Sequence, residues 1–221
     1  MRKSACRNRS RRMLQALHIT SVSMTLAEQI EAAELVCELV SRRQQVSPKR
    51  LVAPGPTPKQ IDQLWKAAAQ APDHGLILPW RFIQVSDAAR DELGAAFEQA
   101  LLERDPAATQ MQREDARAKA ARAPFLALAV SRLEGDDHAE IPATERLVSL
   151  GCALQNMLLM AQAQGFGAGL VSGQAMDAVA LRTLFGLSSH EKAVCFIVIG
   201  TVLKAKASRV RPTAADFVNL L

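Results

Sequence analysis

The segment from residue 143 to residue 164 is the feature that most constrains the fold of this chain. Leu147, Leu150, Leu154, Leu158 and Ala161 form one apolar stripe at helical spacing, and other apolar side chains cover much of the remaining surface. A helix that is apolar almost all round has to be buried. We therefore expect a central core helix that other layers of the domain cover.

Shorter patterns predict the elements around this helix. A first helix is expected from about residue 25 to 42, with an apolar face of Leu26, Ile30, Ala33, Cys37 and Val40. A second helix should begin at Pro58 after a Thr57 capping box, and a third should follow Asp87 as its cap. Two more helices are expected, one over 107–122 and one that is capped by Asp177 and ends at Gly186. Strands are expected over 80–86, from Pro124 through the apolar run FLALAVS, over 167–172 and over 193–201. Strands separated by helices, one strand being wholly apolar, indicate a layered domain of the α/β type with a covered sheet.

Composition excludes several classes of protein. The 221 residues are 49% hydrophobic and 22% charged, which is typical of one ordinary globular domain. Apolar runs such as residues 194–199 are far shorter than the roughly 18 residues that a membrane-spanning helix needs. The four cysteines form no C-x-x-C pair and the four histidines show no metal-ligand spacing, so we expect no metal site and reduced thiols in a cytoplasmic protein.

The net charge of +5 is unevenly distributed along the chain. Residues 1–23 carry six Lys or Arg and no acidic residue, which leaves 21 basic against 22 acidic residues over 24–221. We therefore expect no nucleic-acid partner for the folded part, which we place at residues 24–221 as a single domain. Residues 1–23 are interpreted as a disordered basic extension, upstream of an alternative start at Met24. A nucleic-acid or membrane contact of this extension is the other interpretation.

Two glycine-containing segments resemble catalytic motifs but lack their context. Residues 165–169 read G-F-G-A-G, in the order helix, glycines, strand, whereas a dinucleotide-binding motif has a strand before its glycines and a helix after them. Residues 169–173 read G-L-V-S-G, which is not the G-x-S-x-G nucleophile elbow. We therefore expect neither a Rossmann site nor a serine hydrolase.

Two basic clusters remain to be explained. One contains Arg42, Arg43, Ser47, Lys49 and Arg50, and the other contains Lys204, Lys206, Ser208, Arg209 and Arg211. Arginine forks and serine hydroxyls are the groups that bind a phosphate. From composition alone, a solvated surface is the favoured interpretation of each cluster.

The segment A-P-D-H over residues 71–74, followed by P-W-R-F over 79–82, favours the phosphate-binding interpretation of the two basic clusters. Together with the arginine-rich segment after the first helix, the apolar central helix, Q-G-F-G with S-G, and the terminal G-T with K-A-S, it resembles the nitroreductase family of FMN-dependent oxidoreductases, in its small NAD(P)H nitroreductase branch. The motifs occur in the family order and cover about residues 26–221.

The resemblance implies an α+β fold in which helices cover a central sheet around the apolar core helix. It also implies a homodimer with FMN at the subunit interface and a C-terminal extension that wraps the partner chain. The residues that match the FMN-binding positions of the family are Arg42, Arg43, Ser47, Lys49, Gln70, His74, Leu170, Val171, Ser172, Lys206, Ser208 and Arg209. Which of the two arginines holds the phosphate stays open, because the segment R-R-Q-Q-V-S-P-K-R is longer than the family pattern. A turn or capping role is the alternative for His74.

The activity implied by the resemblance is hydride transfer from NADH or NADPH to FMN, and then to a small-molecule acceptor such as a nitroaromatic or a quinone. No catalytic side chain is expected, because the flavin carries the chemistry. Leu170 and Val171 stand where the branch can show W-R, and Leu78 stands where a glutamine often precedes P-W. These departures make the pocket more apolar, and they motivate an alternative: a flavin-binding carrier or sensor without efficient turnover.

Overall fold

The computed structural model describes residues 24–134, 138–204, 207 and 210–221. Its contacts form two compact units, residues 1–38 and 39–221, and each is considered by itself. Helix α2 spans Leu26–Arg42, as predicted, and crosses the boundary between the units. No residue of α2 is buried against the rest of the described chain, and Leu26 on its apolar face is 73% exposed.

The second unit is built on one antiparallel sheet. Its strands are β1 (Leu51–Val52), β2 (Trp80–Gln84), β3 (Phe125–Arg132), β4 (Gly167–Val171) and β5 (Glu191–Val202). They follow the order β1-β5-β3-β2, and β4 also pairs with β5; every one of these pairings is antiparallel. The α+β fold is therefore confirmed, and the α/β interpretation of the apolar strand was wrong. Residues 125–130 of β3 are all apolar because both faces of the sheet are covered there, and a parallel neighbour is not needed for that.

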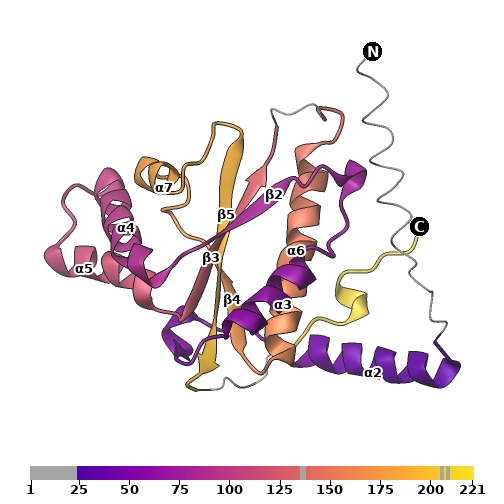
Figure 1. Cartoon of the computed structure of the whole chain (residues 1–221). Helices are drawn as coiled ribbons and strands as arrows, with labels where there is room; N and C mark the ends of the chain where they lie inside the picture. The colour runs from indigo at the N-terminus through magenta and orange to yellow at the C-terminus, as the bar shows by residue number, and fades with distance from the viewer. Residues whose placement is uncertain (1–23, 135–137, 205–206, 208–209) are drawn as a thin grey trace, which may run out of the picture. The chain divides into compact units, whose positions relative to one another are not determined.

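Helices cover both faces of the sheet (Figure 1). Helices α3 (Pro58–Ala68) and α6 (Ala143–Ala163) pack on one face, where Ala127, Ala129 and Ile197 join their core. Helices α4 (Arg90–Arg104) and α7 (Val179–Leu184) cover the other face, where Leu128 and Val198 join a second core, and α5 (Gln110–Ala118) packs against α4. Alternating side chains of each strand thus enter opposite cores, as strand geometry requires.

The central helix α6 confirms the expected core helix, with one difference in the buried stripe. Leu150, Leu154, Leu158 and Ala161 are buried, but Leu147 is 40% exposed. The neighbouring Arg146 is buried instead, and its guanidinium donates to the carbonyl oxygens of Ile141 at 3.0 Å and His138 at 2.7 Å. Hydrogen bonds to carbonyl groups let a charged side chain take a core position that its type rarely occupies.

Local chemistry sets the ends of several helices. Thr57 forms the predicted capping box with Gln60 at the start of α3. Two predicted caps were wrong: α7 begins after Ala178 and not at Asp177, and Asp87 lies inside a short helix, η3 (Asp87–Ala89), that precedes α4. The other short 3₁₀ helices are η1 (Pro48–Arg50), η2 (His74–Leu76), η4 (Lys119–Ala121) and η5 (Ala214–Asp216). No helix in the described part of the chain has the length and apolar character needed to cross a membrane.

Candidate functional site

The segment of residues 42–50, called here the basic loop, is held against the outer edge of β4. The Gln45 side chain donates to the Leu170 carbonyl at 2.6 Å and accepts from the Leu170 amide at 3.1 Å. The Val46 amide donates to the Ala168 carbonyl at 2.9 Å, and Gln45 pairs with Ala168 as an isolated parallel bridge. These bonds extend the sheet by a short irregular strand, so the loop's basic side chains are carried on a fixed backbone.

Two glycines of β4 make this close approach possible. A Cβ atom on Gly169 would lie 2.3 Å from the Val46 carbonyl oxygen, and one on Gly167 would lie 2.4 Å from the Val202 side chain. Contacts this short are not tolerated by a real side chain. The G-x-G pattern that resembles a nucleotide motif in sequence is therefore explained by packing: Gly169 makes room for the basic loop, and Gly167 makes room mainly for Val202 of β5.

Two cavities of about 230 Å³ each lie along the basic loop. The Ser47 cavity is lined by Ser47, Gln44, Val171 and Arg211 among others, and the Arg42 cavity by Arg42, Arg50 and Lys204 among others. No aspartate or glutamate lines either cavity in the described part of the chain. The polar side chains that line them are guanidinium, ammonium, amide and hydroxyl groups, the donor set that suits an anion such as a phosphate ester, and apolar side chains such as Val171 and Phe166 complete the walls.

The two basic clusters of the sequence meet at these cavities. The Arg211 guanidinium donates to the Arg43 carbonyl at 3.3 Å, and the Arg50 guanidinium donates to the Lys204 carbonyl at 3.4 Å. Lys206, Ser208 and Arg209 lie outside the described residues, although their described neighbour Ala207 lines the Ser47 cavity. The structure therefore brings the early and late basic segments together within one chain.

A second candidate region is the A-P-D-H loop, defined as residues 71–78. The Asp73 carboxylate accepts from the Leu78 amide at 2.7 Å, while its other oxygen is buried without a hydrogen-bond partner. Gly75, Leu76 and Leu78 all have positive φ angles, of 71°, 54° and 46°. Leucine in this conformation costs about 1–3 kcal/mol, and such strain is typical of functional sites.

His74 and Gln70 belong to this second region. His74 Nδ1 lies 2.7 Å from the Glu145 carboxylate on α6, so a neutral ring donates its Nδ1–H to the carboxylate and keeps Nε2 free as an acceptor. Gln70 follows the end of α3, where its amide donates to the Ala67 carbonyl. Neither residue lines the cavities of the basic loop.

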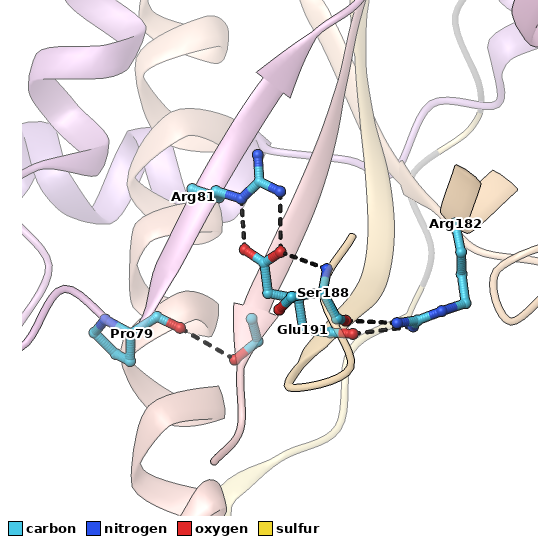
Figure 2. Close-up of polar contacts among 6 residues, drawn as sticks. Pro79, Arg81, Arg182, Ser188 and Glu191 are labelled. Atoms are coloured by element: carbon cyan, nitrogen blue, oxygen red, sulfur yellow. Dashed lines mark hydrogen bonds and ion pairs between the residues drawn. The ribbon is translucent and has the colours of Figure 1, made fainter. Parts of the chain in front are cut away.

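The residues that follow the A-P-D-H loop anchor it to the sheet. The Pro79 carbonyl accepts from the Arg132 amide at 2.8 Å, and the Trp80 indole donates to the buried Ser149 hydroxyl at 2.9 Å. Arg81 forms a two-pronged pair with Glu191, at 2.6 and 3.0 Å (Figure 2). This pairing, together with the Ser188 amide, lowers the pKa of Glu191 from its ordinary value of 4.5 to about 2.

An aromatic cavity lies beside the A-P-D-H loop. This Trp80 cavity of about 490 Å³ is lined by Trp65, Trp80, Phe82, Leu78 and Asp73 among others. The ring centroids of Trp65 and Phe82 are 5.5 Å apart. The loop therefore borders a wall of tilted aromatic rings with Asp73 as the one acidic group among its described lining residues, in contrast to the cationic cavities of the basic loop.

The predicted site residues thus fall into two groups. Arg42, Ser47 and Val171 line the cavities of the basic loop, Leu170 holds Gln45, and Ser172 follows β4; Lys49 is exposed and lines neither cavity. Residue matching missed Gln45, Arg50, Lys204 and Arg211. The last three belong to the basic clusters, so their charge was a usable signal, whereas nothing in the sequence identifies Gln45 as the residue that fixes the loop.

The described residues hold no group of three or more His, Cys, Asp or Glu side chains that could bind a metal ion. Burial raises the pKa of the Cys195 thiol to about 11, so this cysteine is protonated at neutral pH and does not act as a nucleophile. The described residues of the two regions offer binding groups and apolar walls.

Comparison with known proteins agrees with this arrangement. The model of the Nitroreductase family matches residues 43–201, which is more than half of the chain. A Haemophilus influenzae protein named "putative NAD(P)H nitroreductase" is 32% identical over 176 residues, covering 79% of this chain and 94% of that protein. A protein of the same description from Escherichia coli K12 is 33% identical over 191 residues, covering 86% and 99%.

Solved structures show the same fold at lower identity. A nitroreductase-like protein from Bacillus cereus has a TM-score of 0.72 at 17% identity, over 84% of this chain and 95% of that one. A nitroreductase from Bacteroides fragilis, solved with bound FMN, has a TM-score of 0.65 at 17% identity, over 84% and 98%. The extent of the family match and the identity to the two relatives together show that this chain belongs to the nitroreductase family of oxidoreductases.

Proposed function

We propose that this chain binds FMN and uses NADH or NADPH to reduce a small-molecule acceptor such as a nitroaromatic or a quinone. The observation that carries the proposal is the pair of cavities on the basic loop, which are lined by cations and hydrogen-bond donors and by no carboxylate. Family membership supports the proposal, and so do two structural neighbours. One was solved with FMN, and one from Mycobacterium smegmatis is an FMN-dependent nitroreductase in complex with NADPH.

The residues of the basic loop fit the phosphate end of such a cofactor. Ser47 supplies a hydroxyl donor to one cavity, and Arg42, Arg50 and Lys204 supply positive charge to the other. Charge-assisted hydrogen bonds to a phosphate contribute about 1.5–3 kcal/mol each. Arg43, Lys49, Lys206, Ser208 and Arg209 remain part of the proposed phosphate-binding set.

Other residues would surround the ring system. Bound FMN would supply a two-electron carrier that accepts hydride from a nicotinamide and delivers it to the acceptor. Leu170 and Val171 would exclude water from one side, and His74 would present Nε2 to a polar edge because Glu145 holds its Nδ1. Gln70 and Ser172 complete the proposed contacts. The chain itself needs only to bind and orient the flavin and its substrates and to keep water out, so no side-chain nucleophile is required.

The proposal includes a cytoplasmic homodimer with FMN at the subunit interface. Exposed apolar side chains support an interface: Leu35 and Val36 on α2 are 58% and 56% exposed, and Phe217 near the C-terminus is 67% exposed. The C-terminal residues would wrap the partner chain and bury these side chains. Residues 24–221 act as the single domain in this proposal, and residues 1–23 as a separate extension.

The first experiment is the visible absorption spectrum of the full chain, purified without added cofactor and then mixed anaerobically with NADH or NADPH. We expect a flavin band that bleaches within seconds with one or both nucleotides, and reoxidation by a nitroaromatic or a quinone. A flavin band that neither nucleotide bleaches would favour the carrier or sensor alternative. A colourless protein that takes up no added FMN would contradict the whole proposal.

The second experiment tests the binding residues. The double variant Lys204→Gln with Ser47→Ala should retain FMN at least 10-fold less tightly in equilibrium titrations, since each lost contact to phosphate is worth about 1.5–3 kcal/mol. The matched control, Lys59→Gln with Ser86→Ala, removes the same groups from exposed positions away from both cavities. Equal affinities for the two double variants would remove the basic loop from the binding site.

A further inference from the structure

A separate cavity of about 320 Å³ lies on the face of the sheet that α4 covers, and we call it the α4 cavity. Its walls include Phe97 and Leu101 of α4, Leu126 and Phe196 of the sheet, and Met176. The rings of Phe97 and Phe196 meet edge to face, with centroids 5.7 Å apart. The volume falls in the usual range for small-molecule sites, about 300–1,000 Å³, and the walls suit an apolar body.

Four cationic side chains line the same cavity. They are Arg90, Arg104, Lys119 and Arg122, and no aspartate or glutamate is among the lining residues of this described region. Burial lowers the pKa of Lys119, and repulsion from Arg122 and Arg104 lowers it further, although Asp115 opposes the shift. Like charges that repel one another beside an apolar cavity are stabilised when an anion binds among them.

The four cations differ in how they are held. Arg90 donates to the Ala120 carbonyl at 2.7 Å and the Pro124 carbonyl at 3.1 Å, so it has a structural role. Arg122 donates to the Asp115 carbonyl at 3.3 Å and lies 3.9 Å from its carboxylate. The side chains of Arg104 and Lys119 make no hydrogen bond or ion pair with any residue that the structure describes. These two side chains are therefore available to a ligand.

We propose that the α4 cavity is a second binding site, which takes a small amphipathic carboxylate: the apolar body lies against Phe97, Phe196 and Met176, and the carboxylate lies between Arg104 and Lys119. The apolar walls disfavour a bare inorganic anion, because it would lose its hydration without gaining apolar contacts. The cationic rim disfavours an amine or another cation with the same body.

The α4 cavity is a neighbour of the proposed flavin site and is distinct from it. It shares Pro48 and Val171 with the Ser47 cavity, and Ser172 also lines it. Its cations, however, come from residues 90–122 and belong to neither basic cluster. Because none of the four cations of the α4 cavity lines either cavity of the basic loop, we expect a carboxylate to bind between Arg104 and Lys119 while FMN is present.

The test is titration calorimetry of the full chain with octanoate, with and without saturating FMN. We expect octanoate to bind under both conditions, and acetate and octylammonium to bind at least 10-fold more weakly. Arg104→Gln with Lys119→Gln should weaken octanoate binding at least 10-fold. The matched control, Lys59→Gln with Lys66→Gln, removes two exposed cations of α3 and should leave the affinity unchanged.

A second measurement locates the ligand. With ¹³C-methyl methionine labelling, octanoate should shift the methyl resonance of Met176, which lines the cavity, and leave that of Met157, which is buried in the core on the opposite face of the sheet. Equal affinity for octanoate and octylammonium, an unchanged Met176 resonance, or an unaffected double variant would overturn the proposal. Displacement of octanoate by FMN would assign the cavity to the flavin site. Octanoate binding needs no flavin, so failure here is distinct from failure of the proposed function.

Discussion

The basic loop and the A-P-D-H loop form the two candidate regions in opposite ways. The basic loop has no residue in the left-handed region, and it is held by hydrogen bonds from Gln45 and Val46 to β4, where Gly169 leaves the space for its approach. The A-P-D-H loop contains backbone strain at Leu76 and Leu78 and is held at its end by Trp80 and Arg81. The first loop presents charge, and the second presents a shaped apolar wall. The cationic cavities thus depend on space that the neighbouring strand β4 leaves, whereas the wall of the aromatic cavity depends on strained backbone within the A-P-D-H loop itself.

The largest expected effect comes from removing the space beside the basic loop. Gly169→Ala places a Cβ atom 2.3 Å from the Val46 carbonyl, so the loop has to move away from β4. We expect the free energy of unfolding to fall by about 3 kcal/mol, the upper part of the range for overpacking, and FMN retention to be lost. Denaturant unfolding and flavin content measure the two effects.

The control for this variant is Gly151→Ala on α6. An added Cβ atom there meets nothing within 4 Å, and alanine is a better helix former than glycine, so this variant should gain up to about 1 kcal/mol. If Gly169→Ala were as stable as Gly151→Ala and kept its flavin, the two loops would not differ in the way described.

An intermediate effect is expected at the end of the A-P-D-H loop. The pKa of Glu191 is lowered to about 2, so its contribution to stability is present above its ordinary pKa of 4.5 and is lost as the pH falls through about 2. Glu191→Gln should therefore lose about 2 kcal/mol at neutral pH, a value that allows for the partial exposure of Arg81. The stabilities of the variant and the parent should converge at acid pH in thermal melts.

Glu103→Gln is the matched control, since this exposed carboxylate at the end of α4 makes no hydrogen bond or ion pair with the described residues. Its stability should follow the parent at every pH. A constant difference between Glu191→Gln and the parent from neutral to acid pH would show that the pair with Arg81 does not hold the loop.

The smallest effect is expected from relieving the strain inside the A-P-D-H loop. Leu76 is 87% exposed and has a φ of 54°, so Leu76→Gly removes strain and little buried surface. We expect a net gain of about 1 kcal/mol in the free energy of unfolding, with lower turnover if the wall shape matters to the acceptor. Leu203→Gly, at an exposed leucine outside the left-handed region, should instead lose about 0.5–1 kcal/mol. A loss of stability in Leu76→Gly would contradict the role assigned to strain.

Much of the fold could be predicted because it rests on local patterns. The Thr57 capping box, the apolar run of β3 and the core helix α6 are each encoded by residues close together in sequence, and all three are confirmed. Strand direction was not accessible from such patterns, because a strand covered on both faces is apolar whether its neighbours are parallel or antiparallel. Burial of Arg146 was also hidden, since it depends on carbonyl groups of a loop that only the folded chain brings near.

The positive charge of the candidate site could be predicted from the sequence, but the contacts that hold the basic loop in place could not. Runs of Lys and Arg identify both basic clusters, and the structure joins them through Arg50 and Arg211. The role of Gln45 depends on its hydrogen bonds to Leu170, which lies 125 residues further along the chain. No local sequence pattern predicts such a contact. The flavin contacts of all twelve matched residues stay predictions: Arg42, Arg43, Ser47, Lys49, Gln70, His74, Leu170, Val171, Ser172, Lys206, Ser208 and Arg209.

The two glycines of β4 also set a rule for engineering this protein. A mutant library that seeks new acceptors could vary Leu76, which is exposed and lines the Trp80 cavity, but it should keep Trp80, which is buried and donates to Ser149. It should leave positions 167 and 169 untouched, since any larger residue there pushes into the backbone or side chain of an adjacent segment. Variants that do carry a side chain at either position and keep their colour would be expected to hold compensating changes at Val46 or Val202, which makes these pairs the first place to look for second-site suppressors.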